Sequence, residues 1–441
     1  MWAAVSRGVK SVHRLRWLVV ASADIPESKY GIDVGASSRR RLRMITRVIS
    51  SGVFTRKRLQ MHDLRRAAPP EHAARHRVHK NRIAGLDLAK SLAIFLVIFV
   101  HYIFYTGFVS DTALNNLAST FSVVGVPLFF AVNGYLLMNS RFSANKHLHK
   151  ILRMVFILLA WKIISLPILS ALMRKRIDWK LVPQYLLGGS YDVVPLGYFW
   201  FINALLAIYI VFPILKTVYD DPNGKRYLAY VTIVLGALIF AVTLGDNAKD
   251  ILSSYSGHQV PQVLASISQY NMLGDYGYAL VYFVAGGYGH DIAAWLSRRF
   301  SSARAKNICL ALVALLAWGL LFTLQRFQAR TKGISFDIES GYQNVLTLIL
   351  AIALFQLFIQ VRKVPSGLNA IVTAIGSNTL GIYYLHLMLI LVVRDLVLHF
   401  HLFYKAPMLI NLVLVAAIVL IAAFISWVGG KIPLFRHLFI G

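Results

Sequence analysis

The stretch KSLAIFLVIFVH, residues 90–101, places ten uncharged and mostly apolar residues between a lysine and a histidine. Such a run can cross a bilayer core of about 30 Å as part of a longer helix. Because a chain in lipid must satisfy its own backbone hydrogen bonds, helices are the expected solution. Comparable runs lie at about 86–106, 117–138, 151–173, 196–217, 228–246, 277–296, 307–326, 343–361, 370–393 and 408–430. The sequence therefore predicts an all-α, polytopic membrane bundle of about ten transmembrane helices.

The composition agrees with this class. Of 441 residues, 57% are hydrophobic and only 15% are charged, which is too little charge for a soluble protein of this size. The one cysteine, Cys309, excludes an intrachain disulfide and argues against a thiolate site. The pairs His147/His149 and His399/His401 have a spacing that puts their rings on opposite helix faces. No metal site is predicted.

Residues 1–81 carry 18 Lys and Arg against 5 Asp and Glu. Without interleaved aromatic residues or a nucleic-acid-binding fold, this segment is interpreted as a basic, disordered cytoplasmic tail, and no nucleic-acid partner is expected. Met44 and Met61 leave open a start further along the chain. The predicted transmembrane domain then covers residues 82–441.

Lysine and arginine in the short loops predict the orientation. Placing both termini in the cytoplasm puts most basic loops inside, at 141–150, 225–226, 298–306 and 362–363. Two basic segments, 174–180 and 326–332, are then placed in extracytoplasmic loops, where the positive-inside rule predicts few basic residues. The long polar segment 247–276 is expected to be either a lid or acceptor-binding element on the outer face, or a plain irregular connector.

The first span holds three polar residues, Asp87, Lys90 and His101. Eleven residues make almost three helical turns, so Lys90 and His101 share a face and lie about 16 Å apart along the axis. Asp87 is one turn before Lys90 and can pair with it. Charged groups within a span are expected to face a cavity or the protein interior. Spacing alone also allows Lys90 to snorkel and His101 to bond a neighbouring helix.

Five blocks of sequence resemble the acyltransferase family 3 membrane proteins. They are Arg82 with IAGLDLAKSLAIFLVIFVH (83–101), GVPLFFAVNGYLL (125–137), KILR (150–153), FWFINALLAIYIVFP (199–213) and IGSNTLGIYYLHLMLI (375–390). Lys90 and Lys150 stand where the family has arginine, and Asn133 stands where it has serine. These departures affect hydrogen-bond geometry more than the class of reaction.

The resemblance implies transfer of an acyl group, most often acetyl, from cytoplasmic acyl-CoA to a hydroxyl of an extracytoplasmic glycan or lipid-linked sugar. The implied setting is the bacterial inner membrane, with membrane lipid as a partner. A sugar hydroxyl needs a general base, and His101 suits that role. Lys90, Lys150 and Arg153 are the candidates for holding the CoA phosphates.

The remaining candidates have supporting roles. Asn133 and Asn203 are expected either to orient the base and polarise the thioester, or to bond between helices. His386 is read as either structural or catalytic, Lys162 as a possible lining residue of the same cavity, and Asp87 and Trp200 as supporting residues. The rival hypothesis is a secondary transporter or flippase that uses His101 and Lys90 as a proton or substrate pathway.

Overall fold

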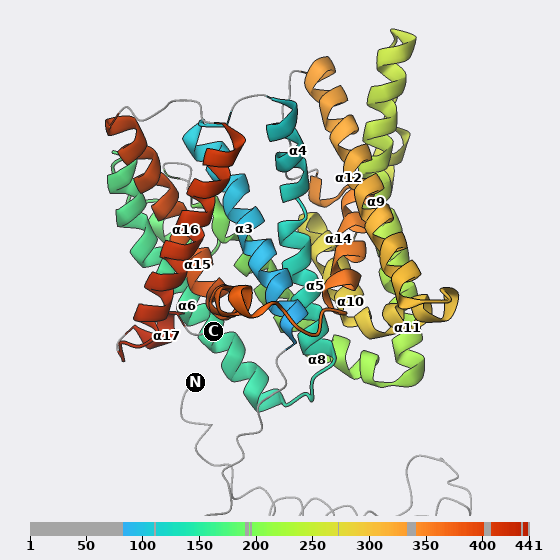
Figure 1. Ribbon diagram of the computed structural model, residues 1–441, viewed down its shortest axis with the longest axis horizontal. Coiled ribbons are helices and arrows are strands. Elements are labelled where there is room, and N and C mark those ends of the chain that lie inside the picture. The colour runs from blue at the N-terminus through green and yellow to red at the C-terminus, as the bar shows by residue number, and fades with distance from the viewer. Residues whose placement is uncertain are drawn as a thin grey trace, which may run out of the picture. The chain divides into compact units, whose positions relative to one another are not determined.

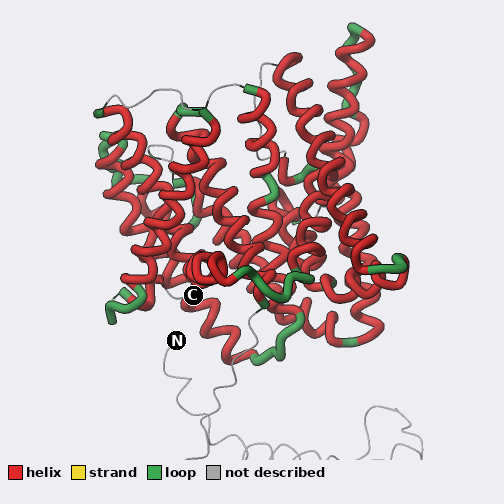
Figure 2. Tube along the Cα trace, in the orientation of Figure 1, coloured by secondary structure: helices red, strands yellow, loops and turns green. Residues whose placement is uncertain are grey.

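The computed structural model describes residues 83–109, 112–189, 194, 196–271, 273–332, 341–400, 407–433 and 435–439. The chain divides into two units, Met1–His79 and Lys80–Gly441, and every described residue belongs to the second. The predicted basic tail and Arg82 therefore lie outside the described residues. Within the described part, the secondary structure is helical and no strand occurs (Figure 2).

Eight helical segments in the described part are long and apolar enough to cross a membrane. They are α3 (Ala84–Thr106), α4 with α5 (Ala113–Ser122 and Gly125–Met138), α6 (Ala144–Leu172), η1 with α8 (Gly197–Phe199 and Trp200–Asp220), α9 (Pro222–Ser256), α12 (Ala303–Lys332), α15 (Ser366–His399) and α16 (Met408–Gly429). Two shorter apolar helices are α10 (Gly277–Gly287) and α14 (Val345–Phe358). The remaining elements are α7 (Val182–Leu186), η2 (Val263–Tyr270), η3 (Gly274–Tyr276), α11 (Gly289–Arg299) and α17 (Arg436–Phe439). The predicted all-α polytopic bundle is confirmed.

Helix α10 corrects one predicted boundary. The predicted span 277–296 ends at Gly287, and the chain continues as the separate helix α11, which lies at the end of the bundle where α3 begins (Figure 1). Helix α11 carries Asp291, Arg298 and Arg299, which are costly in hydrocarbon. At 1.5 Å per residue α10 extends only about 16 Å, so it does not reach across a bilayer core by itself.

The polar segment 247–276 is also more regular than predicted. Helix α9 continues through it as far as Ser256, and η2 then folds back against α9. The side chain of Gln262 donates from Nε2 to the carbonyl of Val242 at 3.1 Å, which anchors this return. Likewise, Arg326 and Arg330 lie within α12 and not in a loop, because that helix extends to Lys332.

Helices α3 and α15 run parallel, in contact through the polar face of α3. Ser91 Oγ donates to the carbonyl of Val372 at 3.1 Å, and Lys90 Nζ donates to the carbonyl of Gly376 at 2.8 Å. Ten residues further along α15, His386 contacts His101. A Cβ atom added at Gly376 would lie 3.0 Å from Asp87. The absence of a side chain at Gly376 thus lets α15 approach the first turns of α3.

Helices α5 and α10 are in backbone contact through two glycines. A Cβ at Gly134 would lie 1.7 Å from the carbonyl oxygen of Phe283, and one at Gly286 would lie 2.0 Å from that of Ala131. Small residues that let helices approach are a common device in membrane bundles, where the hydrophobic effect does not drive helix association. This contact fixes α5, and with it Asn133, against the rest of the bundle.

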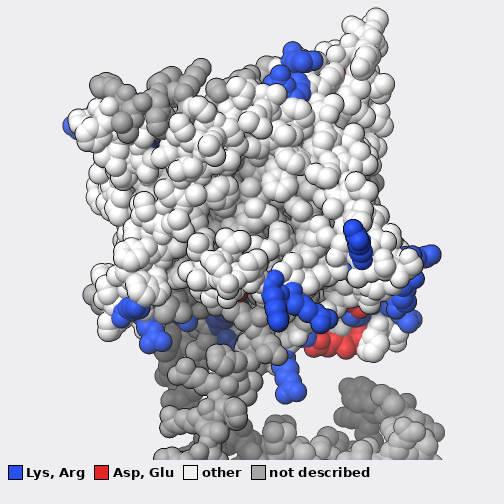
Figure 3. Space-filling model, viewed as in Figure 1, with Lys and Arg blue, Asp and Glu red and all other residues white. Residues whose placement is uncertain are grey.

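Charged side chains are unevenly distributed on the face shown in Figure 3. Most of the visible Lys and Arg lie toward the end of the bundle that carries α11, and a second group lies at the opposite end (Figure 3). The surface between them is mainly uncharged, as expected for a surface in contact with lipid tails.

Candidate active site

Three of the predicted cations line one pocket. Lys90 reaches it from α3, and Lys150 and Arg153 reach it from α6. Its volume is about 220 Å³, and its other lining residues are Phe129, Val132, Asn133, Leu136, Met154, Ile157, Phe201, Ile202, Leu205, Tyr209, Thr379, Leu380, Tyr383 and Tyr384. Five helices, α3, α5, α6, α8 and α15, therefore enclose a site with a cationic side and an apolar and aromatic side.

Lys90 is held in place by two partners. Its Nζ lies 2.8 Å from Asp87 Oδ1, which confirms the predicted pairing one turn apart, and 2.8 Å from the carbonyl oxygen of Gly376. The Asp87 side chain is 5% exposed and the Lys90 side chain is 22% exposed. Because an ammonium group has three N–H donors, these two contacts leave one donor for a ligand in the pocket.

A second cation, Lys150, lies over the ring of Tyr209. Lys150 Nζ lies 4.9 Å from the centre of the Tyr209 ring, a distance suited to a cation–π interaction. The Tyr209 hydroxyl donates to Asn133 Oδ1 at 3.3 Å, and Asn133 Nδ2 donates to the carbonyl of Phe129 at 2.9 Å. Asn133 therefore belongs to the pocket wall, where its amide fixes Tyr209.

His101 lies along α3 beyond the pocket. Its Nδ1 is 2.8 Å from the carbonyl oxygen of Val97, so Nδ1 carries the proton and donates it to that carbonyl. The other nitrogen, Nε2, then has its lone pair available as a base. A backbone carbonyl of its own helix therefore orients this ring.

His386 packs edge-on against His101, with ring centres 4.9 Å apart and an interplanar angle of 70°. It is fully buried, and its Nδ1 donates to the carbonyl of Tyr383. Tyr383 in turn lines the cationic pocket. The His101–His386 pair is therefore separated from that pocket by one aromatic residue.

Three other predicted residues do not line this pocket. Lys162 is only 2% exposed, and its Nζ donates to the carbonyl of Tyr185 at 2.7 Å, which ties α6 to α7. Trp200 stacks on Tyr276 with ring centres 5.5 Å apart. Asn203 is half-buried on α8. Conversely, Tyr209 and Tyr383 were missed as site residues, although both lie in blocks that carry the family resemblance.

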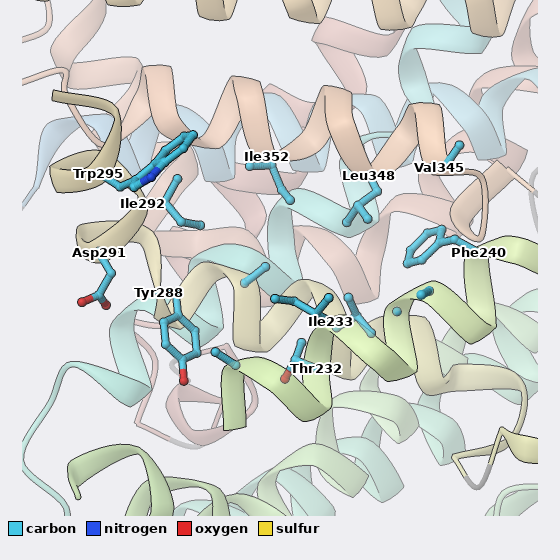
Figure 4. Close-up of a pocket in the computed structure, with 15 residues that line it drawn as sticks. Thr232, Ile233, Phe240, Tyr288, Asp291, Ile292, Trp295, Val345, Leu348 and Ile352 are labelled. Carbon is cyan, nitrogen blue, oxygen red and sulfur yellow. The ribbon is translucent and has the colours of Figure 1, made fainter. Parts of the chain in front are cut away.

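A larger cavity of about 540 Å³ lies between α9, α10, α11 and α14 (Figure 4). Its walls are mostly apolar, with Phe240 and Val345 toward one end and Asp291 toward the other. Asp291 Oδ2 is 2.8 Å from Lys225 Nζ, so its charge is already compensated. None of the predicted site residues lines this cavity. The smaller cationic pocket is therefore the better candidate site.

Among the residues that the structure describes, no group of three or more His, Cys, Asp or Glu side chains could hold a metal ion. The two histidines that lie together, His101 and His386, each direct Nδ1 to a backbone carbonyl. The absence of a metal from the site stays a prediction.

Comparison with known families matches residues 83–428 to acyltransferase family 3, described as an acyltransferase domain. The chain belongs to this family. It is accordingly a membrane acyltransferase, and the match covers all five blocks that carry the resemblance except Arg82. Searches of curated proteins and of solved structures found no match.

Proposed function

We propose that this acyltransferase moves a short acyl group, most simply acetyl, from acyl-CoA to a hydroxyl of a glycan or lipid-linked sugar. The observation that carries the proposal is the gathering of Lys90, Lys150 and Arg153 around one pocket. CoA is a polyanion with a long flexible arm that ends in the thioester. Cations that converge from separate helices suit its phosphates, and the apolar and aromatic wall suits the arm.

The spacing along α3 supports the same assignment. His101 lies eleven residues, or about 16 Å, beyond Lys90 on the same helix face. The pantetheine arm of CoA separates phosphate from thioester by a comparable length. A donor whose phosphates lie at the cations would therefore present its thioester toward His101, past Tyr383.

The reaction then needs one base and no covalent enzyme intermediate. His101 Nε2 accepts the hydroxyl proton of the acceptor while the hydroxyl oxygen attacks the thioester carbonyl carbon. The tetrahedral intermediate collapses with cleavage of the carbon–sulfur bond. The CoA thiolate leaves and takes the proton back from the His101 imidazolium, so that an ester and CoA–SH are released and the base is regenerated.

The proposed orientation places the donor on the cytoplasmic side. The basic segments at 141–150, 225–226 and 298–306 lie at the end of the helices where the cationic pocket is found, as the positive-inside rule requires for a cytoplasmic face. The acceptor would approach from the opposite end, near His101. Both termini are then cytoplasmic, and the setting that we propose is the inner membrane of a bacterium.

The test is acyl transfer by the purified protein in lipid nanodiscs. Acetyl-CoA is supplied with a crude lipid and glycan extract of the native membrane, and thiol release and acetyl incorporation are measured. We expect acceptor-dependent CoA release that His101→Gln lowers by at least about 100-fold, because a general base contributes 10²–10⁴-fold. Solute movement without binding or cleavage of acyl-CoA would instead favour a transporter. Comparing the surface glycans of cells with and without the gene by mass spectrometry would identify the acceptor.

A further inference from the structure

We propose that the large cavity between α9, α10, α11 and α14 binds one hydrocarbon chain of a membrane phospholipid whose headgroup carries both a phosphate and an ammonium group. The proposal goes beyond acyl transfer, and it involves neither the acyl donor nor the acceptor. It assigns an occupant to a space of about 540 Å³ that lies apart from the cationic pocket.

The cavity is too large to be a packing defect. Protein interiors leave few voids larger than a water molecule, whereas this volume lies within the usual range of ligand pockets, about 300–1,000 Å³. Small residues create the space, because Gly236 and Ala237 line it from α9 and Ala285 lines it from α10. With mostly apolar walls the cavity offers few partners to water, so an apolar occupant is favoured.

The cavity opens toward lipid. Two of its lining residues, Ile233 and Trp295, are 71% and 51% exposed. Helix α9 is one of the segments that are long and apolar enough to cross the membrane. The medium beside its apolar part is therefore hydrocarbon, and a lipid chain is the occupant that this medium supplies.

The length of the cavity corresponds to one leaflet. Its lining residues on α9 run from Ala229 to Phe240, which is eleven residues or about 16 Å, and half of a bilayer core is about 15 Å. Phe240 and Val345 lie toward one end and Asp291 toward the other (Figure 4). In the proposed orientation the Asp291 end is cytoplasmic, so the chain belongs to a lipid of the cytoplasmic leaflet.

The polar end matches a headgroup with both charges. The Asp291 and Lys225 side chains form an ion pair at 2.8 Å and are still 47% and 30% exposed. Arg299 lies 5.8 Å from the centre of the Trp295 ring, and tryptophan is enriched at the membrane interface. Lys225 and Arg299 can hold the phosphate, while the N–H groups of the lipid ammonium donate to Asp291. An anionic headgroup without such donors would leave the Asp291 carboxylate beside a like charge.

The bound chain should also stabilise the protein. Helix α10 presents Val281 and Ala285 to the cavity, and through Gly286 it contacts α5, the helix that carries Asn133. Filling the cavity adds packing contacts to α10, which is too short to cross the membrane by itself. A ligand that binds only the folded state raises the unfolding midpoint.

The test measures retained lipid on the full-length protein without any acyl-CoA, so its outcome is independent of the proposed function. Protein in mild detergent is equilibrated with equal amounts of phosphatidylethanolamine, phosphatidylglycerol and phosphatidylcholine, and bound lipids are counted by native mass spectrometry. We expect one phosphatidylethanolamine per chain to be retained in preference, because its ammonium has N–H donors and the choline group has none.

Two tryptophan variants on exposed positions of α9 test the site. Ala237→Trp fills the cavity and should lower the retained lipid at least about tenfold, because displacing even two methylene groups costs about tenfold in affinity. Val234, which is 39% exposed and does not line the cavity, provides the matched control Val234→Trp, which should behave as wild type. Added phosphatidylethanolamine should raise the unfolding midpoint of wild type and of the control, but not of Ala237→Trp. Ile233→Phe is a second filling variant if Ala237→Trp does not fold.

Asp291→Asn tests the headgroup. This variant should still retain a lipid, but it should lose the preference for phosphatidylethanolamine over phosphatidylglycerol, because the carboxylate that accepts from the ammonium is gone. The proposal is wrong if wild type retains no lipid, if it retains the three lipids equally, or if Ala237→Trp and Val234→Trp retain the same amount.

Discussion

Replacing Lys90 by methionine should have two separable effects, one on stability and one on acyl-CoA binding. The first follows from the pairing of Lys90 with Asp87, which is nearly buried. Removing one partner of a buried ion pair costs about 3–5 kcal/mol. Because the Lys90 side chain is 22% exposed and partly screened by solvent, we expect about 2 kcal/mol for this pair.

The second effect concerns the donor. In the proposed complex, the third N–H of Lys90 contacts a CoA phosphate, and a hydrogen bond to a charged group is worth about 1.5–3 kcal/mol. At about 1.4 kcal/mol per factor of ten, its loss should raise the KM for acetyl-CoA by about 10- to 100-fold. Lys90→Arg keeps the charge and should change the KM by no more than about threefold, since the family resemblance places arginine here.

The double variant Asp87→Asn/Lys90→Met separates the two effects. It neutralises the Asp87 carboxylate as well as removing the Lys90 ammonium, so neither charge of this pair stays buried without the other. The unfolding midpoint should therefore rise toward the wild-type value while the KM stays high. The assay is the dependence of initial CoA release on acetyl-CoA concentration, with thermal unfolding measured on the same samples. If Lys90→Met lowers stability and leaves the KM unchanged, Lys90 is structural and the phosphate assignment is refuted.

Gly286→Ala should lower the free energy of unfolding by about 1–3 kcal/mol, because the added Cβ would lie 2.0 Å from the Ala131 carbonyl oxygen. Gly319→Ala is the matched control and should not be destabilising, because a Cβ added there would have no neighbouring atom within 4 Å. The measurement is thermal unfolding of both variants. Arg153→Met should raise the KM for acetyl-CoA about tenfold, because it removes one of the cations that line the pocket. An unchanged KM would remove Arg153 from the donor site. Lys162→Met should leave that KM within about twofold in the same CoA-release assay, because Lys162 bonds Tyr185 and does not line the pocket.

Local spacing predicted the features that depend on one helix. The i, i+3 pairing of Asp87 with Lys90 follows from helix geometry and is confirmed at 2.8 Å. The alignment of Lys90 and His101 on one face is likewise confirmed, because both contact α15. The break at Tyr288 was missed, since the apolar run 277–296 has no proline and its charged residues come late.

Contacts between helices could not be predicted in the same way. The sequence separates Lys90 from Gly376 by 286 residues, and His386 is equally remote from His101. Periodicity indicates which face of a helix is polar, but it does not say which other helix will cover that face. Lys162 is an example. A lysine in the middle of a span suggested that it lines the same cavity, but in the structure it bonds Tyr185.

The sequence by itself determined the class of fold, the family and the stripe of Asp87, Lys90 and His101, because apolar run length, helical period and local motifs are properties of neighbouring residues. Only the tertiary structure decided that Lys90, Lys150 and Arg153 surround one pocket and that His386 is the neighbour of His101. The physical reason is close packing. Glycines such as Gly376 and Gly286 let particular helices approach within backbone contact, and that choice of neighbours assembles the site from residues that lie far apart along the chain.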